Sequence, residues 1–113
     1  TEGLTKIHDV AKSMDSIGLN DRSLIWNTDL VESLELDNLI GQAIVTLTSA
    51  SERQESRGAH SHEDHPDRDD ENWMKHTVMW LDENNQTKTM YRDVHMTTLS
   101  NEVEVIPPAA RVY

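Results

Sequence analysis

Apolar residues recur at intervals of three and four positions along the first part of the chain. The repeating positions between residues 2 and 17 are Leu4, Ile7, Val10, Ala11, Met14 and Ile17. At 3.6 residues per turn these side chains share one stripe of a helix, with polar residues on the other side. The pattern predicts an amphipathic helix that ends at Gly18, because glycine readily adopts the left-handed backbone that closes many helices.

A longer apolar stripe follows Asn27, Thr28 and Asp29, three residues whose side-chain oxygens can cap a helix start. Asp29 and Glu32 also have the spacing of a capping box. The stripe consists of Leu30, Val31, Leu34, Leu39, Ile40, Ala43, Ile44, Leu47 and Ala50. No proline interrupts it, so we expect a helix that runs to about Arg53 and supplies the core. Two stripes this wide leave apolar surface over, which predicts a further helix that is missing here or supplied by a neighbour.

After a polar stretch over residues 55–72, the pattern changes to short segments of β-branched and aromatic residues. Residues 73–81 and 87–94 read as two strands, and the polar run between them is typical of a turn, so we expect an antiparallel hairpin. Residues 97–99 could extend it, Pro107-Pro108 ends any ladder, and residues 109–113 form a tail.

These elements predict an α+β, mainly α fold: an incomplete antiparallel helical bundle, then a polar loop and a small β-hairpin with an extended tail. We expect three parts within one domain. Residues 1–54 are the bundle part, 55–72 a polar docking loop, and 73–113 the hairpin and tail.

The composition narrows the classes of partner. A net charge of −11 with only ten basic residues cannot form the basic patch that nucleic acid requires, and the same sign disfavours an anionic membrane. The chain has no cysteine, which removes disulfides, thiolate nucleophiles and cysteine-type zinc sites. An independent acidic module that binds a basic partner remains one alternative.

Residues 55–70 carry most of the polar chemistry, with three of the six histidines, two arginines and six carboxylates. His60, His62 and His65 fit the His-x-His-x-Asp-His spacing of zinc hydrolases, so a small zinc-binding protein is a second alternative. Its context is wrong, because a long helix precedes the motif and few further ligands follow. The acidic run lacks the spacing of a calcium loop, and no serine sits in a nucleophile-elbow pattern.

Read as whole strings, several stretches resemble the C-terminal region of the flavoprotein subunits of succinate dehydrogenase and fumarate reductase, the bacterial succinate dehydrogenases in particular. These stretches are Asp21-Arg22-Ser23-Leu24-Ile25-Trp26-Asn27-Thr28-Asp29, Glu55-Ser56-Arg57-Gly58-Ala59-His60, Asp69-Asp70-Glu71-Asn72-Trp73-Met74-Lys75-His76-Thr77 and the end from Pro107 to Tyr113. The family usually has Arg at the place of His62 and Phe or Tyr at that of His65. The zinc-like motif therefore looks like two substitutions on a loop that binds no metal.

The resemblance implies a parent enzyme that oxidises succinate to fumarate with FAD. The family holds its FAD covalently in an N-terminal domain and passes electrons to an iron–sulfur subunit and then to quinone. Membrane-anchor subunits place the complex peripherally on the cytoplasmic face of the bacterial inner membrane. By this resemblance the chain starts after the first helix of the bundle, is soluble, and has no catalytic, cofactor-binding or metal residue of its own. We expect it to be inactive alone, to dock on its own flavin-binding domain, and to self-associate through its apolar surface when that domain is absent.

The polar loop is then expected to hold an interdomain network rather than a reaction centre. Its candidate residues are Arg57, His60, Glu63, Asp64, Arg68 and His76. Bidentate pairs between arginine and carboxylate could lock such a loop geometrically against the flavin domain.

Overall fold

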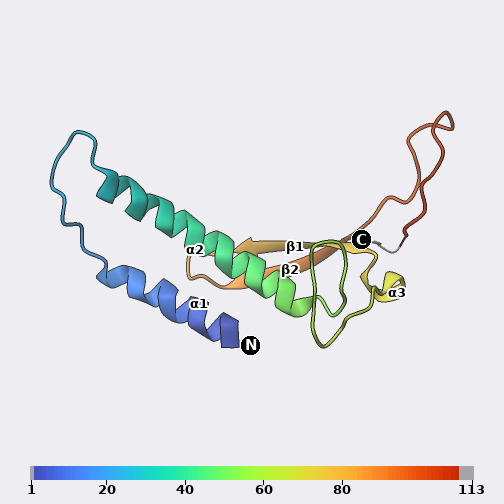
Figure 1. The fold of residues 1–113 in the computed structure, drawn as a ribbon, viewed down its shortest axis with the longest axis horizontal. Coiled ribbons are helices and arrows are strands. Elements are labelled where there is room, and N and C mark those ends of the chain that lie inside the picture. Colours follow the sequence, from blue (N-terminus) through green and yellow to red (C-terminus); the bar gives the residue numbers. More distant parts are fainter. Residues whose placement is uncertain (1, 110–113) are drawn as a thin grey trace. The chain divides into compact units, whose positions relative to one another are not determined.

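The computed structural model describes residues 2–109. Its elements in chain order are α1 (Glu2–Ser13), the 3₁₀ helix η1 (Met14–Ser16), α2 (Thr28–Glu52), α3 (Asp70–Trp73), β1 (Lys75–Leu81) and β2 (Thr87–Asp93) (Figure 1). The predicted α+β, mainly α class is confirmed. The end of the predicted tail, residues 110–113, lies outside the described residues.

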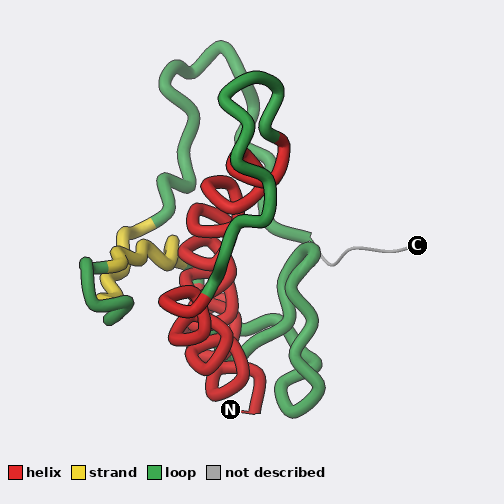
Figure 2. Tube along the Cα trace, turned by 90° about the vertical axis from the view of Figure 1, so that its left-hand side faces the viewer, coloured by secondary structure: helices red, strands yellow, loops and turns green. Residues whose placement is uncertain are grey.

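The chain forms two compact units. Of the described residues, one unit contains 2–52 together with 79–89, and the other contains 53–78 and 90–109. The hairpin of β1 and β2 contributes its turn end to the first unit and its open end to the second. In the first unit α1 and α2 run antiparallel and pack along each other (Figures 1 and 2).

The core of the first unit lies on α2, as its apolar stripe predicts. Ile40 and Ile44 are the buried hydrophobic residues of the described chain, and Thr48, one turn further, is buried with its hydroxyl donating to the Ile44 carbonyl at 2.8 Å. A Cβ at Gly41 would lie 3.4 Å from Leu81 at the end of β1, so this glycine faces the hairpin. The first half of the stripe, including Leu30, Val31, Leu34 and Leu39, stays exposed.

The start of α2 differs in detail from the prediction. Asn27 is the cap, since its Oδ1 accepts the backbone N–H of Leu30 at 2.9 Å. The capping box of Asp29 with Glu32 is wrong, because Asp29 already lies inside the helix. Its carboxylate instead accepts the backbone N–H groups of Asn20 and Asp21 at 2.8 and 3.1 Å, which fixes the preceding connection.

Three other boundary predictions were wrong. The first helical segment ends when Ile17 turns to extended backbone and donates its N–H to the Met14 carbonyl, and the left-handed glycine of residues 2–109 is Gly58, not Gly18. No strand forms at 97–99, where the Thr98 hydroxyl donates to the Ser100 carbonyl at 2.7 Å within a local turn. Residues 70–73 form the short helix α3, which was not predicted, so β1 begins at Lys75 and the predicted strand start at residue 73 was wrong. The hairpin turn is closed by two hydrogen bonds between Asp82 and the 85–86 segment, each 3.0 Å.

Over residues 2–109 we find no helix that is both long and apolar enough to span a lipid bilayer.

Candidate functional site

The centre of the second unit is the carboxylate of Glu55, which is fully buried just beyond the end of α2. Arg53 and Arg57 reach its Oε1 through their Nε atoms at 2.7 and 2.8 Å. Its Oε2 accepts Nη2 of Arg57 and the backbone N–H of Asp69, both at 2.9 Å. Both oxygens of a desolvated anion are thus filled by donors, two of them charged, which is the condition under which a buried charge is tolerated.

The cluster forms directly after the helix. The chain leaves α2 at Glu52, and Arg53, Glu55 and Arg57 follow at alternate positions with a bend at Glu55. Both arginines close onto the carboxylate that lies between them in the sequence.

A second ion pair extends the cluster toward α3. Nη2 of Arg57 donates to Oδ1 of Asp70 at 2.7 Å and to the Asp69 carbonyl at 3.3 Å. Arg68 forks onto the same carboxylate, with Nε 2.9 Å from Oδ1 and Nη2 2.9 Å from Oδ2 of Asp70. We call Arg53, Glu55, Arg57, Arg68 and Asp70 the charge cluster. It fixes both ends of the loop between residues 55 and 70.

Asp69 links the charge cluster to α3. The backbone N–H of Asp69 donates to Glu55. Its side chain caps α3 by accepting the backbone N–H groups of Glu71 and Asn72 at 3.1 and 3.0 Å. The side-chain amide of Asn72 adds a third bond at 2.8 Å. The short helix is therefore held by its cap rather than by its own length.

Arg53 ties the charge cluster to the start of β1. Its Nη1 donates to the Lys75 carbonyl and to the Thr77 hydroxyl, each at 3.0 Å, and its Nη2 donates to the Trp73 carbonyl. The guanidinium also lies over the Trp73 ring, 5.4 Å from its centroid. Tyr91 of β2 contacts the Trp73 ring edge to face at 5.9 Å. Through its bonds to Glu55, Trp73 and the start of β1, Arg53 connects the loop, α3 and the hairpin.

Between its fixed ends the loop folds into two tight turns. Arg57 and His60 exchange backbone hydrogen bonds of 2.9 and 3.0 Å around Gly58, whose φ of 59° is left-handed. The second turn joins His62 and His65. The Ser56 hydroxyl holds this turn by accepting from the His62 N–H at 2.9 Å and donating to the His65 carbonyl at 2.8 Å. The loop is thus internally bonded along its length.

The electrostatics follow from these contacts. Burial alone would raise the pKa of Glu55, but the hydrogen bonds from Arg57, the Asp69 N–H and Arg53 outweigh it and lower the pKa to about 2. The hydrogen bond from Arg57 also lowers the pKa of Asp70, and the amide of Asn72 lowers that of Asp69. All three carboxylates are held in their charged form at neutral pH.

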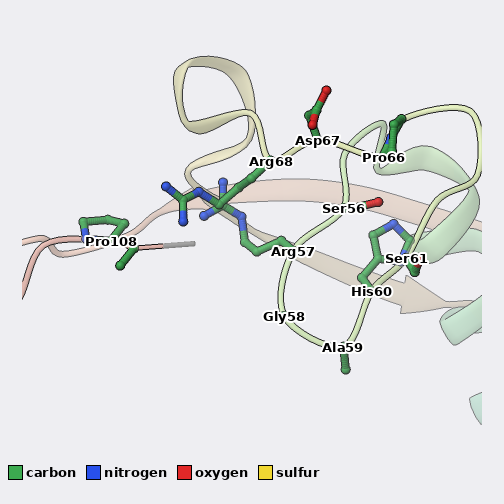
Figure 3. A pocket seen from close by; sticks show the side chains of 11 residues that line it. Ser56, Arg57, Gly58, Ala59, His60, Ser61, Pro66, Asp67, Arg68 and Pro108 are labelled. Carbon is green, nitrogen blue, oxygen red and sulfur yellow. The ribbon is translucent and has the colours of Figure 1, made fainter. Parts of the chain in front are cut away.

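A hollow of about 790 Å³ adjoins the charge cluster and is lined partly by Arg57, Arg68 and Pro108 (Figure 3). The two guanidinium groups extend in the same direction; both pair with Asp70, and Arg57 also pairs with Glu55. Because each guanidinium already has a carboxylate partner, the hollow is not a ready receptor for an anionic ligand.

The structure brings some of the predicted network residues together and leaves others apart. Arg57 and Arg68 belong to the charge cluster, and Nε2 of His60 lies 3.2 Å from the Arg53 carbonyl. Among the described residues, Glu63, Asp64 and His76 are exposed and lie outside the cluster.

Sequence reasoning missed Arg53, Glu55 and Asp70 as members of the cluster. The sequence predicted Arg53 as the end of the helix and Asp70 as part of a solvated acidic turn, and Glu55 entered only through the string that resembles the family. The alternation of Arg53, Glu55 and Arg57 directly after a helix was the available signal, since it places an anion between two cations.

The three loop histidines lie near one another. The ring centroids of His60 and His62 are 6.2 Å apart, and those of His62 and His65 are 4.8 Å apart, both edge to face. Nevertheless, across the part of the chain that the structure describes, no three histidine or carboxylate side chains are placed so that they could hold a metal ion.

Comparison with known proteins identifies the class. The family described as "Fumarate reductase flavoprotein C-term" matches residues 1–113, and the chain belongs to this family. The chain is 54% identical over 112 residues to the succinate dehydrogenase flavoprotein subunit of Rickettsia bellii, a match that covers 99% of this chain and 19% of that protein. The mitochondrial succinate dehydrogenase flavoprotein subunit of Oryza sativa is 51% identical over 112 residues, with 99% and 18% covered.

Solved structures agree with this assignment. The quinol fumarate reductase of E. coli superposes with a TM-score of 0.80 at 34% identity, covering 97% of this chain and 18% of that one. The chain therefore spans about a fifth of the length of the relatives that it matches.

Proposed function

We propose that this chain is the C-terminal domain of the FAD-containing subunit of a succinate dehydrogenase. The observation that carries the proposal is the 54% identity over 112 residues to succinate dehydrogenase flavoprotein subunits. The E. coli fumarate reductase flavoprotein subunit is also related, at 37% identity over 112 residues.

In this proposal FAD and succinate bind in the four-fifths of the flavoprotein that has no counterpart here. Electrons pass from the flavin to an iron–sulfur subunit and then to quinone. Anchor subunits hold the complex peripherally at the cytoplasmic face of a bacterial inner membrane. The 113-residue chain itself contributes no catalytic residue, binds no cofactor and is inactive alone.

The role proposed for residues 55–70 is to dock on the flavin-binding domain. The charge cluster supports this, because it fixes the loop by bidentate and buried ion pairs while the tip of its first turn, Gly58 and Ala59, stays exposed. A loop held this firmly presents a defined surface at little entropic cost on docking.

The first experiment is to purify the longer flavoprotein with its other subunits and to assay both directions of the reaction. We expect bound FAD and succinate-dependent reduction of quinone, and neither property in the 113-residue chain. Failure of the assembled complex to oxidise succinate, or succinate oxidation by the short chain, would overturn the proposal.

The docking role is tested by Arg57→Ala in the same complex, with Arg22→Ala as the control, since Arg22 is an exposed arginine outside the loop. Docking predicts that Arg57→Ala lowers both flavin content and turnover while Arg22→Ala preserves them. Unchanged flavin content and turnover in Arg57→Ala would refute the docking role and leave the family assignment intact.

A further inference from the structure

Three consecutive large apolar side chains stand out from the connection between α1 and α2. Leu24, Ile25 and Trp26 expose 99%, 76% and 93% of their surfaces. We call these three residues the apolar tip. Isolated exposed apolar side chains are ordinary on proteins, but three in a row that include a tryptophan mark a surface suited to a partner.

The backbone that carries the apolar tip is bound on both sides. The Asn27 amide donates to the Asp21 carbonyl at 3.1 Å and to the Ser23 carbonyl at 3.0 Å. The Ser23 N–H in turn donates to the Asp21 carboxylate at 2.8 Å. With Asp29 also accepting two backbone N–H groups of the connection, the tip is positioned by its flanks instead of by apolar contacts.

Trp26 itself has a φ of 54°, in the left-handed region that bulky residues rarely adopt. Its carbonyl accepts the Thr28 N–H at 3.0 Å as α2 begins. A strained backbone persists where the surrounding bonds determine it, and such residues cluster at functional surfaces. Here the residue in the strained conformation is Trp26, which is also almost fully exposed.

A second copy of this chain is a poor occupant for the apolar tip. Two copies would each bring a net charge of −11 to the contact, which opposes association. A stable dimer also buries roughly 800 Å² per partner, whereas a tryptophan contributes about 150–250 Å². Three side chains fall short of that area, but they suit a contact between domains of one polypeptide, where the covalent linkage supplies a high effective concentration.

We propose that the apolar tip, Leu24 to Trp26, docks in an apolar pocket on the part of the flavoprotein polypeptide that lies outside this chain. The inference rests on the proposed function, in which this chain is one domain of a longer flavoprotein. The apolar tip would be a second docking contact beside the polar loop, apolar where the loop is charged. Trp26 has the largest side chain of the three and would bury the most surface. The matched relatives support this occupant, because about four-fifths of each lies beyond the matched region.

Hydroxyl-radical footprinting of the longer flavoprotein tests the proposal. Oxidation of Trp26 is measured in the flavoprotein alone, in the assembled complex, and at two protein concentrations. We expect Trp26 to be protected about tenfold in the flavoprotein alone, at both concentrations, relative to an unfolded control. Protection that appears only with the other subunits, protection that rises with concentration, or no protection would each overturn the proposal.

A variant separates docking from folding. The Leu24→Ser/Trp26→Ser double variant should release this domain to limited proteolysis at least about tenfold faster, while the amides of α2 keep their hydrogen-exchange protection. The matched control is Leu99→Ser, since Leu99 is equally exposed (108%) and lies outside the apolar tip. Equal proteolysis rates for both variants would contradict the docking. FAD content and succinate oxidation of the unmodified complex are scored separately, so failure of the proposed function is distinguishable from failure of this inference.

Discussion

Arg57 donates to both oxygens of the Glu55 carboxylate, with Nε 2.8 Å from Oε1 and Nη2 2.9 Å from Oε2. The carboxylate is fully buried, and the arginine is only partly exposed. A bidentate pair in this setting fixes orientation as well as distance, because both planar groups must stay coplanar to keep both bonds. The loop between them and Asp70 therefore has one arrangement rather than many.

Glu55→Gln is expected to destabilise the loop strongly. The amide keeps the shape of the side chain but removes the charge, and it leaves two partly buried guanidinium groups without their main counterion. Breaking a buried pair in this way costs about 3–5 kcal/mol, reduced here because Asp70 still faces Arg57. Hydrogen exchange at the amides of Arg57 and His60, which bond to each other, measures the loss.

Glu63→Gln is the matched control, since Glu63 is an exposed carboxylate of the same loop. Its effect should stay within about 0.5 kcal/mol. If Glu63→Gln loosened the loop as much as Glu55→Gln, the charge cluster could not be what holds it.

Much of the secondary structure follows from the sequence, and the reason lies in periodicity. The stripe from Leu30 to Ala50 has the helical period throughout and places α2 almost to the residue. The hairpin follows equally from alternation and from the turn residues after Leu81. Both signals repeat along the chain, so a single misleading residue does not hide them.

The candidate site was predictable only in outline. Arg57, His60 and Arg68 could be singled out because the loop is patterned and charged. The burial of Glu55 could not, because it depends on Asp69, fourteen positions later, turning its N–H back toward that carboxylate. No local sequence pattern predicts that a backbone N–H fourteen positions away will bond to Glu55. An acidic residue in a polar run otherwise indicates solvent exposure.

Arg57→Lys should weaken the loop even though the charge is kept. A lysine ammonium is a single point donor and cannot serve both Glu55 oxygens, Asp70 and the Asp69 carbonyl in one geometry. We expect a loss of about 1–3 kcal/mol in the local opening free energy, read from the same amides. Arg22→Lys, at an exposed arginine, should be silent, and equal effects of the two changes would argue against the bidentate pair.

The loop should open as the pH falls. The pKa of Glu55 is lowered from 4.5 to about 2 in the folded protein, so its stabilisation is complete above pH 4.5 and is lost as the pH falls toward 2. The pKa values of Asp69 and Asp70 are also lowered, which adds to the same trend. The contribution of Glu55 is on the order of 3 kcal/mol.

Amide exchange between pH 6 and pH 3, corrected for intrinsic rates, measures this dependence. The Glu55→Gln variant carries no titrating group at that position, so its loop should show a clearly shallower dependence. A slope unchanged by Glu55→Gln would mean that other groups set the acid response.

Asn27→Ala should loosen the first turn of α2. The Asn27 side chain caps the Leu30 N–H at 2.9 Å and also bonds two carbonyls of the connection. Loss of a cap costs about 1 kcal/mol, and the extra bonds should raise that figure. Asn38→Ala is the control, because Asn38 is exposed in the helix interior, where alanine is the better helix former. Hydrogen exchange in the first turn of α2 separates the two, and equal effects would show that Asn27 is not the effective cap.

Gly58→Ala tests the backbone of the loop independently of its charges. Gly58 has a φ of 59°, and a Cβ built there meets nothing within 4 Å, so any loss arises from the left-handed conformation alone. That conformation costs an alanine about 1–2 kcal/mol, and asparagine, which tolerates it better, should fall between glycine and alanine. The control is Gly18→Ala, where space is equally open and φ is not left-handed, so alanine should be neutral or stabilise by about 0.4–1 kcal/mol. The free energy of loop opening should therefore fall in the order glycine, asparagine, alanine at position 58. A flat series there, or a matching loss at position 18, would show that the turn does not require its left-handed residue.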